Sequence, residues 1–540
     1  MSTPSDSPPS SILSPPSALA WAALLLGAGN LASRLLGVVR EQIIAAYFGL
    51  SASSDAFTAA ARVPTALYDL LVGGMISAAL VPIFSDYLAR GQRDELVRVC
   101  RVLLSILAVV LTAIVGLGMV GARPLMDLLA PEYPPETRAM AADLLRMMLP
   151  ALWCLGLSGL LTAYHYARRR FSPPALAAGA YNLGLIIAVP LLVRFLGVHS
   201  LAIGVVLGTL FQVLVQFRGL EGVRLGFGTD WRHPGVRRIY RLYLPVAAGL
   251  VVSLLGVAID TNLASRTGEG SMAAMRFATT LVQFPLGMIA TAVSFAVLPT
   301  LARYASTGTP GQAVTAPSPA DLEGYRTTLG WGIKLVLLAV VPAAVGLVVL
   351  REPVVRLLFE RGAFSPADTS RTALAFLAYS PGLVAAAVDQ VLIVAFYARK
   401  NTVTPVVVGV AAVGVYLATG LALLEPLGMP GLALANSAQW ISHALLLLAL
   451  LGWQVGGWGR LGIGCLAGKA LLAAGGMAGV LLALVPLLEA ALPLAGTLGL
   501  AARLALAVAA GGAAYSGGLL ALRTQEVWSV VGLIKGRLRP

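Results

Sequence analysis

The feature that most constrains this chain is its series of apolar stretches, about fourteen in number, each roughly as long as a membrane-spanning helix. A helix needs about 20 apolar residues to cross ~30 Å of hydrocarbon. Charged or Pro- and Gly-rich segments separate the stretches. We therefore expect an all-α integral membrane protein with spans at 18–48, 60–84, 102–121, 140–166, 174–194, 198–217, 242–264, 271–300, 329–350, 370–397, 403–424, 430–452, 462–487 and 494–521.

Composition narrows the class of protein further. Of the 540 residues, 58% are hydrophobic and 11% are charged, whereas about 25% are charged in soluble domains. The three cysteines and four histidines lack the spacing of a disulfide framework or a zinc site. Gly468-Lys469 lacks the upstream glycine of a phosphate-binding loop. The sequence predicts no resident metal or nucleotide cofactor, so any transport must draw its energy from a source other than ATP.

The net charge of +14 comes from basic residues distributed between the spans. They do not form a basic face, which argues against binding to nucleic acid. They follow spans 2, 4, 6, 10 and 14, and basic residues are retained on the cytoplasmic side. We expect the even-numbered loops and both termini in the cytoplasm. The loops after spans 3 and 9 are exceptions, with Arg123 and Arg138 in the first and Arg351, Arg356, Arg361 and Arg371 in the second.

An internal repeat organises the spans. Two stretches that begin at Arg123 and Glu352 read alike, RPLMDLLAPEYPPETRAMAADLLRMMLP and EPVVRLLFERGAFSPADTSRTALAFLAYSP. Tyr-Ala-Arg follows each stretch at an equivalent distance. The alternative is a chance likeness among apolar helices, but the shared Pro and Tyr-Ala-Arg positions do not belong to the common apolar residues of these helices. Spans 1–6 and 7–12 are therefore predicted to be two six-helix lobes, and such pairs commonly enclose a substrate site at the bilayer midplane.

The expected domains follow from these spans. They are a disordered tail at 1–17, an N-lobe at 18–217, a cytoplasmic linker at 218–241, a C-lobe at 242–452, two further helices within 453–522 and a cytoplasmic tail at 523–540.

Span 1 carries charges inside an apolar run: Arg34, Arg40 and Glu41. A charge at mid-bilayer costs at least ~2.5 kcal/mol, so an intramembrane arginine faces a wet cavity or a partner. The guanidinium fork suits phosphate, and the alternative is an ion pair, with Glu41 or another acid, that holds helices together. Gly37 between the arginines permits a kink or a close approach.

Other polar residues extend this pattern. Asp55 either caps the helix that follows span 1 or contacts substrate. Arg62 and Asp69 are seven residues apart and share a helix face, as an ion pair with span 1 or as a further polar step along the cavity. Arg276 lies early in span 8.

Asp260, Thr261 and Asn262 supply hard oxygen ligands suited to Na⁺. A plain polar cluster at a helix end is the alternative. Asp389 in span 10 and Lys469 in span 13 are further charges within predicted spans.

These residues lie in segments that resemble the MurJ (MviN) lipid II flippases of the multidrug/oligosaccharidyl-lipid/polysaccharide exporter superfamily. The similar segments cover about 18 to 451 and include SRLLGVVRE, SSDAF, LVPIFSDY, LLFERGAFSPADTSRTALAFLAYSPGL and FYARKNTVTP.

The resemblance implies a transporter, not an enzyme, with two lobes around a central cationic cavity. Its last two helices would form a groove for the lipid tail. Alternating access would be driven by the membrane potential, Na⁺ or another ion. Arg34, Arg40 and Asp55 match cavity residues of the family, and Asp260 matches a sodium-ligating acid of some members.

The sequence departs from the family in two spans. In span 2 the family has an arginine pair and an acid one turn later, whereas this sequence has Tyr68, Asp69 and Gly73. In span 8 the family has a cavity arginine, whereas this sequence has Thr280. Arg62 and Arg276 lie within two turns on the same helix faces and are candidates to restore the charge.

The favoured hypothesis is a flippase in the bacterial cytoplasmic membrane. It would carry the undecaprenyl-pyrophosphate-linked peptidoglycan precursor lipid II, with membrane lipids and cell-wall synthesis enzymes as further candidate partners. Arg34, Arg40 and Arg276 would bind phosphate. The alternatives are a flippase for another polyprenyl-pyrophosphate oligosaccharide, a non-transporting scaffold for cell-wall enzymes, and a cation-coupled drug exporter, which the basic span 1 disfavours.

Overall fold

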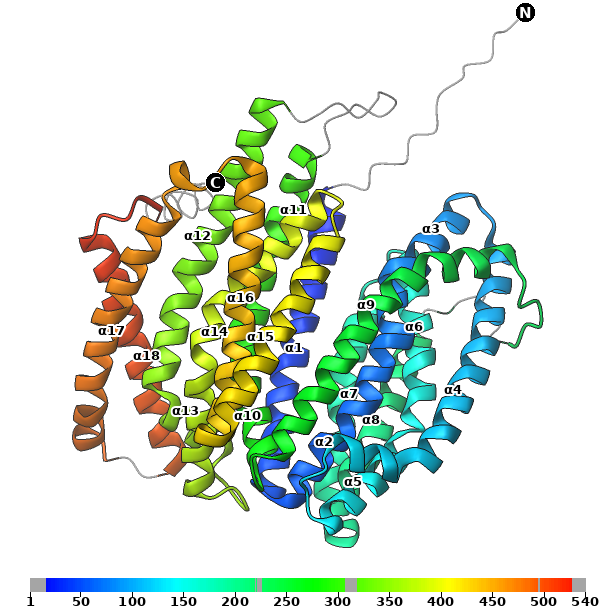
Figure 1. The fold of residues 1–540 in the computed structure, drawn as a ribbon, viewed down its shortest axis with the longest axis horizontal. Helices are drawn as coiled ribbons and strands as arrows, with labels where there is room; N and C mark the ends of the chain where they lie inside the picture. Colours follow the sequence, from blue (N-terminus) through cyan, green and yellow to red (C-terminus); the bar gives the residue numbers. More distant parts are fainter. Residues whose placement is uncertain (1–15, 219, 221–225, 306–317, 494–495, 527–540) are drawn as a thin grey trace, which may run out of the picture. The chain divides into compact units, whose positions relative to one another are not determined.

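The computed structural model describes residues 16–218, 220, 226–305, 318–493 and 496–526, without the side chains of 16–28, 30 and 460. Within these ranges all regular structure is helical (Figure 1), as the sequence predicts. Most of both predicted tails, at 1–15 and 527–540, lies outside the described residues.

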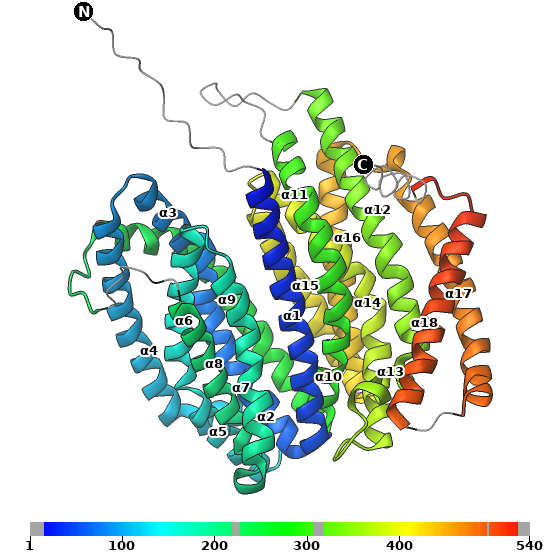
Figure 2. The ribbon, with the colours of Figure 1, turned by 180° about the vertical axis from the view of Figure 1, so that it is seen from behind.

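The first half of the chain forms eight α-helices (Figure 2). They are α1 (Pro16–Phe48), α2 (Ala52–Tyr68), α3 (Val81–Ala89), α4 (Arg93–Leu129), α5 (Pro135–Met148), α6 (Ala151–Ala167), α7 (Ser172–Leu196) and α8 (His199–Phe217). Two π-helical turns, Asp69–Gly73 and Ile76–Leu80, lie between α2 and α3.

The described residues of the second half form ten more α-helices. They are α9 (Pro234–Ser265), α10 (Ser271–Pro285), α11 (Thr291–Ala305), α12 (Pro319–Val349), α13 (Arg351–Phe359), α14 (Pro366–Ala398), α15 (Val403–Leu427), α16 (Met429–Val455), α17 (Ile463–Ala491) and α18 (Gly496–Ala521). A π-helical turn, Leu286–Ala290, joins α10 to α11. The first turns of α9 cover part of the segment predicted as a linker.

Within the described residues, twelve spans are long and apolar enough to cross a membrane, and the number is 13 if the bent pair α5–α6 is counted as one span. The helix α1 has 33 residues. It is not counted among these spans, which comprise described residues only, because the side chains of 16–28 and 30 lie outside the described part of the chain. The predicted number of fourteen therefore remains a prediction, and the difference lies at α1.

The two halves repeat the same series of elements. The spans 52–89 and 271–305 each contain π-helical turns, and α7 and α15 each have 25 residues. Arg169 and Lys400 have left-handed backbone, with φ of 56° and 58°, in the two Tyr-Ala-Arg turns. Gly197 and Gly428, with φ of 53° and 61°, precede α8 and α16. Matching irregularities at matching places support the predicted duplication.

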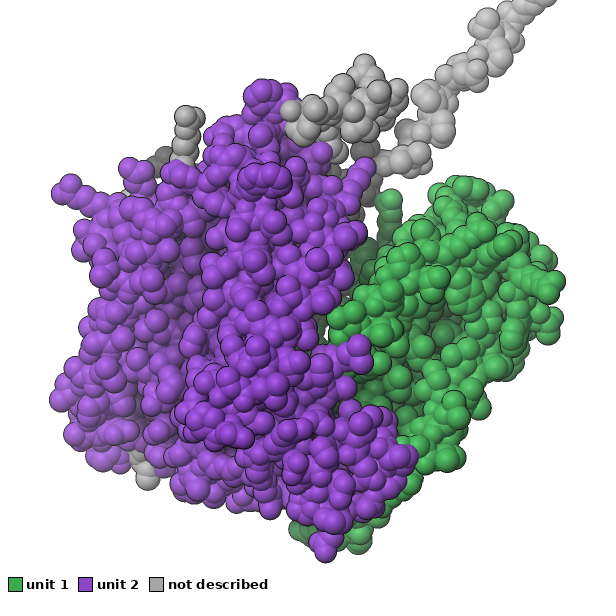
Figure 3. All heavy atoms as spheres, in the orientation of Figure 1, with its two compact units in different colours: residues 1–43, 60–122, 142–254 green, residues 44–59, 123–141, 255–540 purple. Residues whose placement is uncertain are grey.

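By its internal contacts the chain forms two compact units, coloured in Figure 3. Unit 1 comprises 1–43, 60–122 and 142–254, and unit 2 comprises 44–59, 123–141 and 255–540. The division falls within α1, α2, α4, α5 and α9. The predicted domain boundaries are a different division, by repeat, and remain a prediction.

Glycine allows the closest helix contact in unit 1, between α7 and α8. A Cβ on Gly184 would lie 2.1 Å from the backbone nitrogen of Gly208. Any side chain at residue 184 would therefore force the two backbones apart.

The arginines that break the charge rule are engaged locally. Arg123 and Arg138 lie 3.6 and 3.2 Å from Asp127, and Arg356 lies 3.4 Å from Glu360. The remaining three donate to backbone carbonyls: Arg351 to Val348, Arg361 to Leu357 and Arg371 to Glu269. These side chains serve the local structure, which accounts for basic residues where the charge rule does not expect them.

Candidate substrate-binding site

The polar centre of unit 1 is the Arg40 side chain on α1. Its Nε and Nη2 donate to Oε1 of Glu41 at 3.1 and 2.7 Å, and its Nη1 donates to Oδ1 of Asn182 at 2.9 Å. The Tyr181 ring lies 5.9 Å from the guanidinium carbon. Three of the five guanidinium N–H groups are used in these bonds, and the other two have no hydrogen-bond acceptor among the described residues.

The Glu41 carboxylate is almost fully buried, with 2% of its side chain exposed, whereas 27% of the Arg40 side chain is exposed. A buried carboxylate must be paired, because leaving it uncompensated costs several kcal/mol. The ion pair that the sequence offered as an alternative is therefore present. The same arginine also remains accessible, so holding helices together does not remove it as a ligand for phosphate.

Asn182 fixes this pair to a second helix. Its Nδ2 donates to the Ser33 carbonyl of α1 at 3.0 Å, while its Oδ1 accepts from Arg40. Both ends of the amide are thus used between α7 and α1. At Gly37 the helix α1 is unbroken, and a Cβ there would meet nothing within 4 Å among the described residues. The close approach that Gly37 permits is therefore not made in the described part of the chain.

Arg34 lies half-buried on the same helix. Because α1 is unbroken, Arg34 and Arg40 keep the separation of about 120° that six residues impose. They lie on different faces and do not form one stripe.

In span 2, two of the residues that depart from the family pattern, Asp69 and Gly73, lie next to each other. The Asp69 carboxylate lies over Gly73, with Oδ1 3.2 Å from the place that a Cβ there would take. An acidic group therefore occupies the space above residue 73, although the acid is supplied from four residues earlier. Arg62 is half-buried on α2, in the same unit.

In unit 2, Asp55 joins two helices that are distant in sequence. Its carboxylate accepts from the backbone N–H of Gly270 at 2.6 Å and of Ala273 at 2.8 Å. Glu269 in turn accepts from the N–H of Ala52 at 3.0 Å. The first turns of α2 and α10 thus cap each other, which satisfies backbone donors that a helix start leaves unpaired. Capping by Asp55 was expected, but on its own helix; the structure places it on α10.

Arg276 packs against the same start of α2. Its Nη1 lies 3.3 Å from the Thr58 hydroxyl, and its guanidinium carbon lies 5.1 Å from the Phe57 ring. Thr280, one turn later, donates its hydroxyl to the Arg276 carbonyl. The arginine at this end of α10 is therefore engaged with α2, one turn before the position where the family pattern has it.

The three candidate sodium ligands of α9 are not brought together. The Tyr416 hydroxyl donates to Oδ1 of Asp260 at 2.5 Å. The Thr261 hydroxyl donates to the Val257 carbonyl, and the Asn262 amide donates to the Leu128 carbonyl. Successive residues on a helix point about 100° apart, so their oxygens diverge. Neither does the described part of the chain hold a group of three or more His, Cys, Asp or Glu that fits a metal ion.

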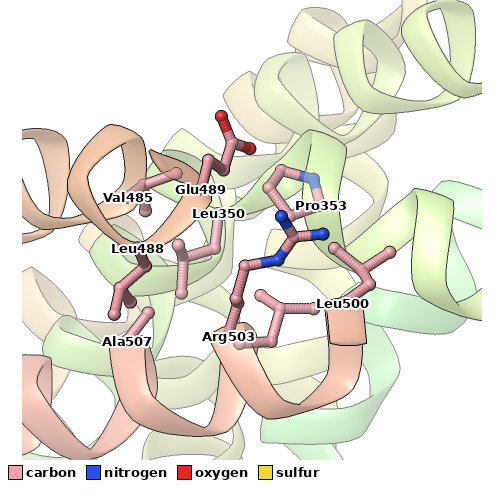
Figure 4. A pocket seen from close by; sticks show the side chains of 9 residues that line it. Leu350, Pro353, Val485, Leu488, Glu489, Leu500, Arg503 and Ala507 are labelled. Atoms are coloured by element: carbon pink, nitrogen blue, oxygen red, sulfur yellow. The ribbon is translucent and has the colours of Figure 1, made fainter. Parts of the chain in front are cut away.

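The predicted lipid-tail helices α17 and α18 line a small apolar pocket with the α12–α13 junction (Figure 4). It is lined by Leu350, Pro353, Val485, Leu488, Glu489, Leu500, Arg503, Leu504 and Ala507. The Arg503 side chain extends from α18 toward Pro353 (Figure 4). Large apolar side chains on both helices are exposed, among them Leu487 at 63% and Leu498 at 87%, as expected of surfaces in lipid.

Sequence reasoning missed Asn182, Tyr181 and Tyr416, which complete the polar contacts of Arg40 and Asp260. The available signal was a polar side chain inside an apolar span, because such residues are expensive in lipid and are held by partners. That signal marks the residue but does not identify the partner.

Comparison with known proteins decides the family. The family model described as lipid II flippase MurJ matches residues 44–493. The chain belongs to the MurJ family. The match begins after Arg34 and Arg40, so the interpretation of these two residues depends on α1 itself.

Curated members of the MurJ family are similar over most of their length. The probable lipid II flippase MurJ of Vibrio cholerae is 32% identical over 437 residues, 78% of this chain and 81% of the relative. The lipid II flippase MurJ of Burkholderia cenocepacia is 30% identical over 439 residues, with 79% and 82% covered. The chain is therefore a multi-pass membrane protein of a bacterial transporter family.

Solved structures show the same fold. A lipid II flippase MurJ in an inward closed conformation matches with a TM-score of 0.74 at 22% identity, over 92% of this chain and 99% of that one. An inward-facing multidrug resistance transporter of the MATE family, in the MOP superfamily, matches with a TM-score of 0.65 at 13% identity, over 82% and 98%. The predicted MOP fold is confirmed.

Proposed function

We propose that this chain translocates lipid II from the inner to the outer leaflet of the bacterial cytoplasmic membrane. The observation that carries the proposal is the Arg40 guanidinium, which Glu41 and Asn182 hold within a membrane protein of the MurJ family with two N–H groups left over. Moving a pyrophosphate and sugars through hydrocarbon unaided is prohibitive, and arginine forks replace the lost hydration.

In this proposal Arg34 and Arg40 bind the pyrophosphate, with Arg62 and Arg276 as further cationic contacts. Asp55 holds the starts of α2 and α10 together and so keeps Arg276 in position. The exposed apolar surfaces of α17 and α18 accommodate the polyprenyl tail. The chain itself catalyses no covalent chemistry, because translocation by alternating access makes and breaks no covalent bond.

The orientation belongs to the same proposal. Basic residues follow the even-numbered spans and the arginines of two contrary loops serve local structure, which supports both termini in the cytoplasm. Cysteines introduced in the loops and labelled from one side of the membrane test this orientation. Labelling of the loop at 399–402 from outside intact cells contradicts it.

Growth of a strain depleted of its own lipid II flippase tests the proposed substrate. We expect this chain to restore growth, and cells carrying it to present lipid II in the outer leaflet. If the chain is instead a flippase for another polyprenyl-pyrophosphate oligosaccharide, or a scaffold for cell-wall enzymes, the depleted cells do not recover translocation of lipid II. That failure contradicts the proposal.

Sodium coupling through Asp260 has a direct test. Since the oxygens of Asp260, Thr261 and Asn262 diverge in the structure, we expect exchange of sodium for potassium to leave lipid II translocation in vesicles unchanged. The variant Asp260→Asn, which keeps an acceptor for Tyr416, is the matched control. Translocation that requires sodium in the original chain but not in Asp260→Asn shows instead that Asp260 binds Na⁺.

A further inference from the structure

A His–Asp pair inside unit 2 has no part in the proposed lipid site. Nδ1 of His443 on α16 lies 2.7 Å from Oδ1 of Asp389 on α14. Nε2 of the same ring lies 3.2 Å from the Pro405 carbonyl of α15. The pair thus joins α14, α15 and α16, which correspond to the spans predicted at 370–397, 403–424 and 430–452.

The hydrogen-bond roles fix the number of protons that this arrangement holds. A carbonyl oxygen only accepts, so a hydrogen bond between Nε2 of His443 and Pro405 requires a hydrogen on Nε2. The short contact at Nδ1 then needs one more proton, carried either by the ring or by the Asp389 carboxyl. With both ring nitrogens placed against acceptors, the pair holds one proton more than a neutral histidine beside a carboxylate.

The site is enclosed but not sealed. The side chains of His443 and Asp389 are 13% and 15% exposed. Pro405 lies in the first turn of α15, beside the turn at 399–402. The proposed topology assigns this turn to the cytoplasmic side of the membrane.

Removing the proton disturbs helix packing. A neutral ring keeps one hydrogen, so its other nitrogen turns a lone pair toward an acceptor: the Asp389 carboxylate at 2.7 Å or the Pro405 carbonyl at 3.2 Å. Either contact is then repulsive. The contact between α14 and α16 is tight, because the Ser437 hydroxyl of α16 donates to the Ala378 carbonyl of α14 at 2.8 Å, and a Cβ on Gly382 would lie 2.7 Å from Cα of Ser437. Loss of the proton therefore weakens the contact of α16 with α14 or with α15.

Other ionisable groups lie on the helices packed against the pair, and at the end of α14 the guanidinium carbon of Arg399 lies 5.8 Å from the Tyr325 ring. On α14 itself, Tyr397 lies close enough to Asp389 to interact with it electrostatically. On α15, Tyr416 donates to Asp260, and Glu425 lies twenty residues after Pro405. On α10, α11 and α12 the engaged groups are Arg276 with Thr58, Arg303 with Tyr304, Tyr325 with the Ala395 carbonyl, Arg326 with the Gly457 carbonyl and Lys334 with Glu526.

We propose that His443 and Asp389 form a proton-binding site whose occupancy is coupled to the packing of α14, α15 and α16, so that a proton gradient drives translocation. When the helices separate, the bound proton passes to water at the turn beside Pro405: one N–H or O–H bond of the pair breaks and one O–H bond forms on the accepting water. The coupling rests on the proposed lipid II translocation, whereas the binding of the proton does not.

Nitrogen-15 NMR of the four histidines in the full chain tests proton binding without any transport. Infrared absorption of a protonated carboxyl complements it. At pH 8, where a free imidazole is neutral, we expect either doubly protonated His443 or a protonated Asp389, lost in Asp389→Asn. The variant His443→Gln identifies the nitrogen-15 signals of His443 by their loss. If His443→Gln does not fold, substitution of the other three histidines identifies the same signals by elimination.

The chain contains a matched internal comparison, His165. Its Nε2 also lies against a carbonyl, that of Gln216 at 2.9 Å, but its buried Nδ1 has no hydrogen-bond partner among the described residues. We expect His165 to be neutral in the same sample. A neutral His443 without a protonated carboxyl at pH 8 overturns the proton site.

Reconstituted vesicles test the coupling. A pH step of one unit shifts a one-proton equilibrium by up to about tenfold, so we expect it to shift the distribution of lipid II between leaflets by up to that factor. In Asp389→Asn and His443→Gln we expect translocation to persist without this shift. An equal shift in the variants overturns the coupling, whereas a chain that moves no lipid II at all overturns the proposed function and leaves the NMR result standing.

Discussion

Neutralising the Arg40–Glu41 pair together, as Arg40→Gln with Glu41→Gln, is expected to abolish most lipid II translocation while the protein stays folded. The amides keep the polar packing against Asn182 and leave no buried charge. The variant lacks the charge-assisted bonds to pyrophosphate, each of which is worth about 1.5–3 kcal/mol, or roughly ten- to hundredfold in rate. Translocation of lipid II in reconstituted vesicles, with thermal unfolding of the same preparation, measures both properties.

Single variants separate binding from stability. Arg40→Ala removes two charge-assisted hydrogen bonds from the buried Glu41 carboxylate, each worth about 1.5–3 kcal/mol, so we expect lower stability as well as lost transport. Arg34→Gln leaves the bonds between Arg40 and Glu41 in place and is expected to lose transport at an almost unchanged melting temperature. If the double variant moves lipid II at the rate of the original chain, Arg40 does not bind the pyrophosphate.

The second large effect is expected at Asp55. Asp55→Ala removes the acceptor for two backbone N–H groups at the start of α10, and each buried donor left without a partner costs about 1–3 kcal/mol. We expect a clear fall in the melting temperature of the solubilised protein and a loss of complementation. Asp55→Asn keeps one acceptor oxygen and is expected to lie between Asp55→Ala and the original chain.

Glu269→Gln is the matched control for Asp55, because Glu269 performs the reciprocal cap from an exposed position. The amide oxygen still accepts from Ala52, so we expect almost no change in melting temperature. Equal, small effects at both residues would show that the junction of α2 and α10 does not depend on the Asp55 cap.

The helical fold was predictable because hydropathy and helix length are local properties of a chain in a membrane. The repeat was predictable because Pro and Tyr-Ala-Arg recur at equivalent positions. The structure adds the left-handed backbone at Arg169 and Lys400 to that repeat.

The contacts of the candidate site were not predictable, because each depends on a residue far away in sequence. Arg40 and Asn182 are 142 residues apart, Asp55 and Gly270 are 215 apart. A pattern marks a costly charge but leaves its partner open. The neighbouring residues Asp260, Thr261 and Asn262 are adjacent in sequence, but their oxygens diverge around the helix because successive side chains point in different directions.

The most direct test of the central claim is translocation by the purified chain in lipid vesicles. Fluorescent lipid II placed in one leaflet is followed into the other, beside a different polyprenyl-pyrophosphate oligosaccharide and beside the Arg40→Gln, Glu41→Gln variant. We predict rapid movement of lipid II that the double variant lacks. Movement of the other oligosaccharide but not of lipid II, or movement of neither, contradicts the assignment.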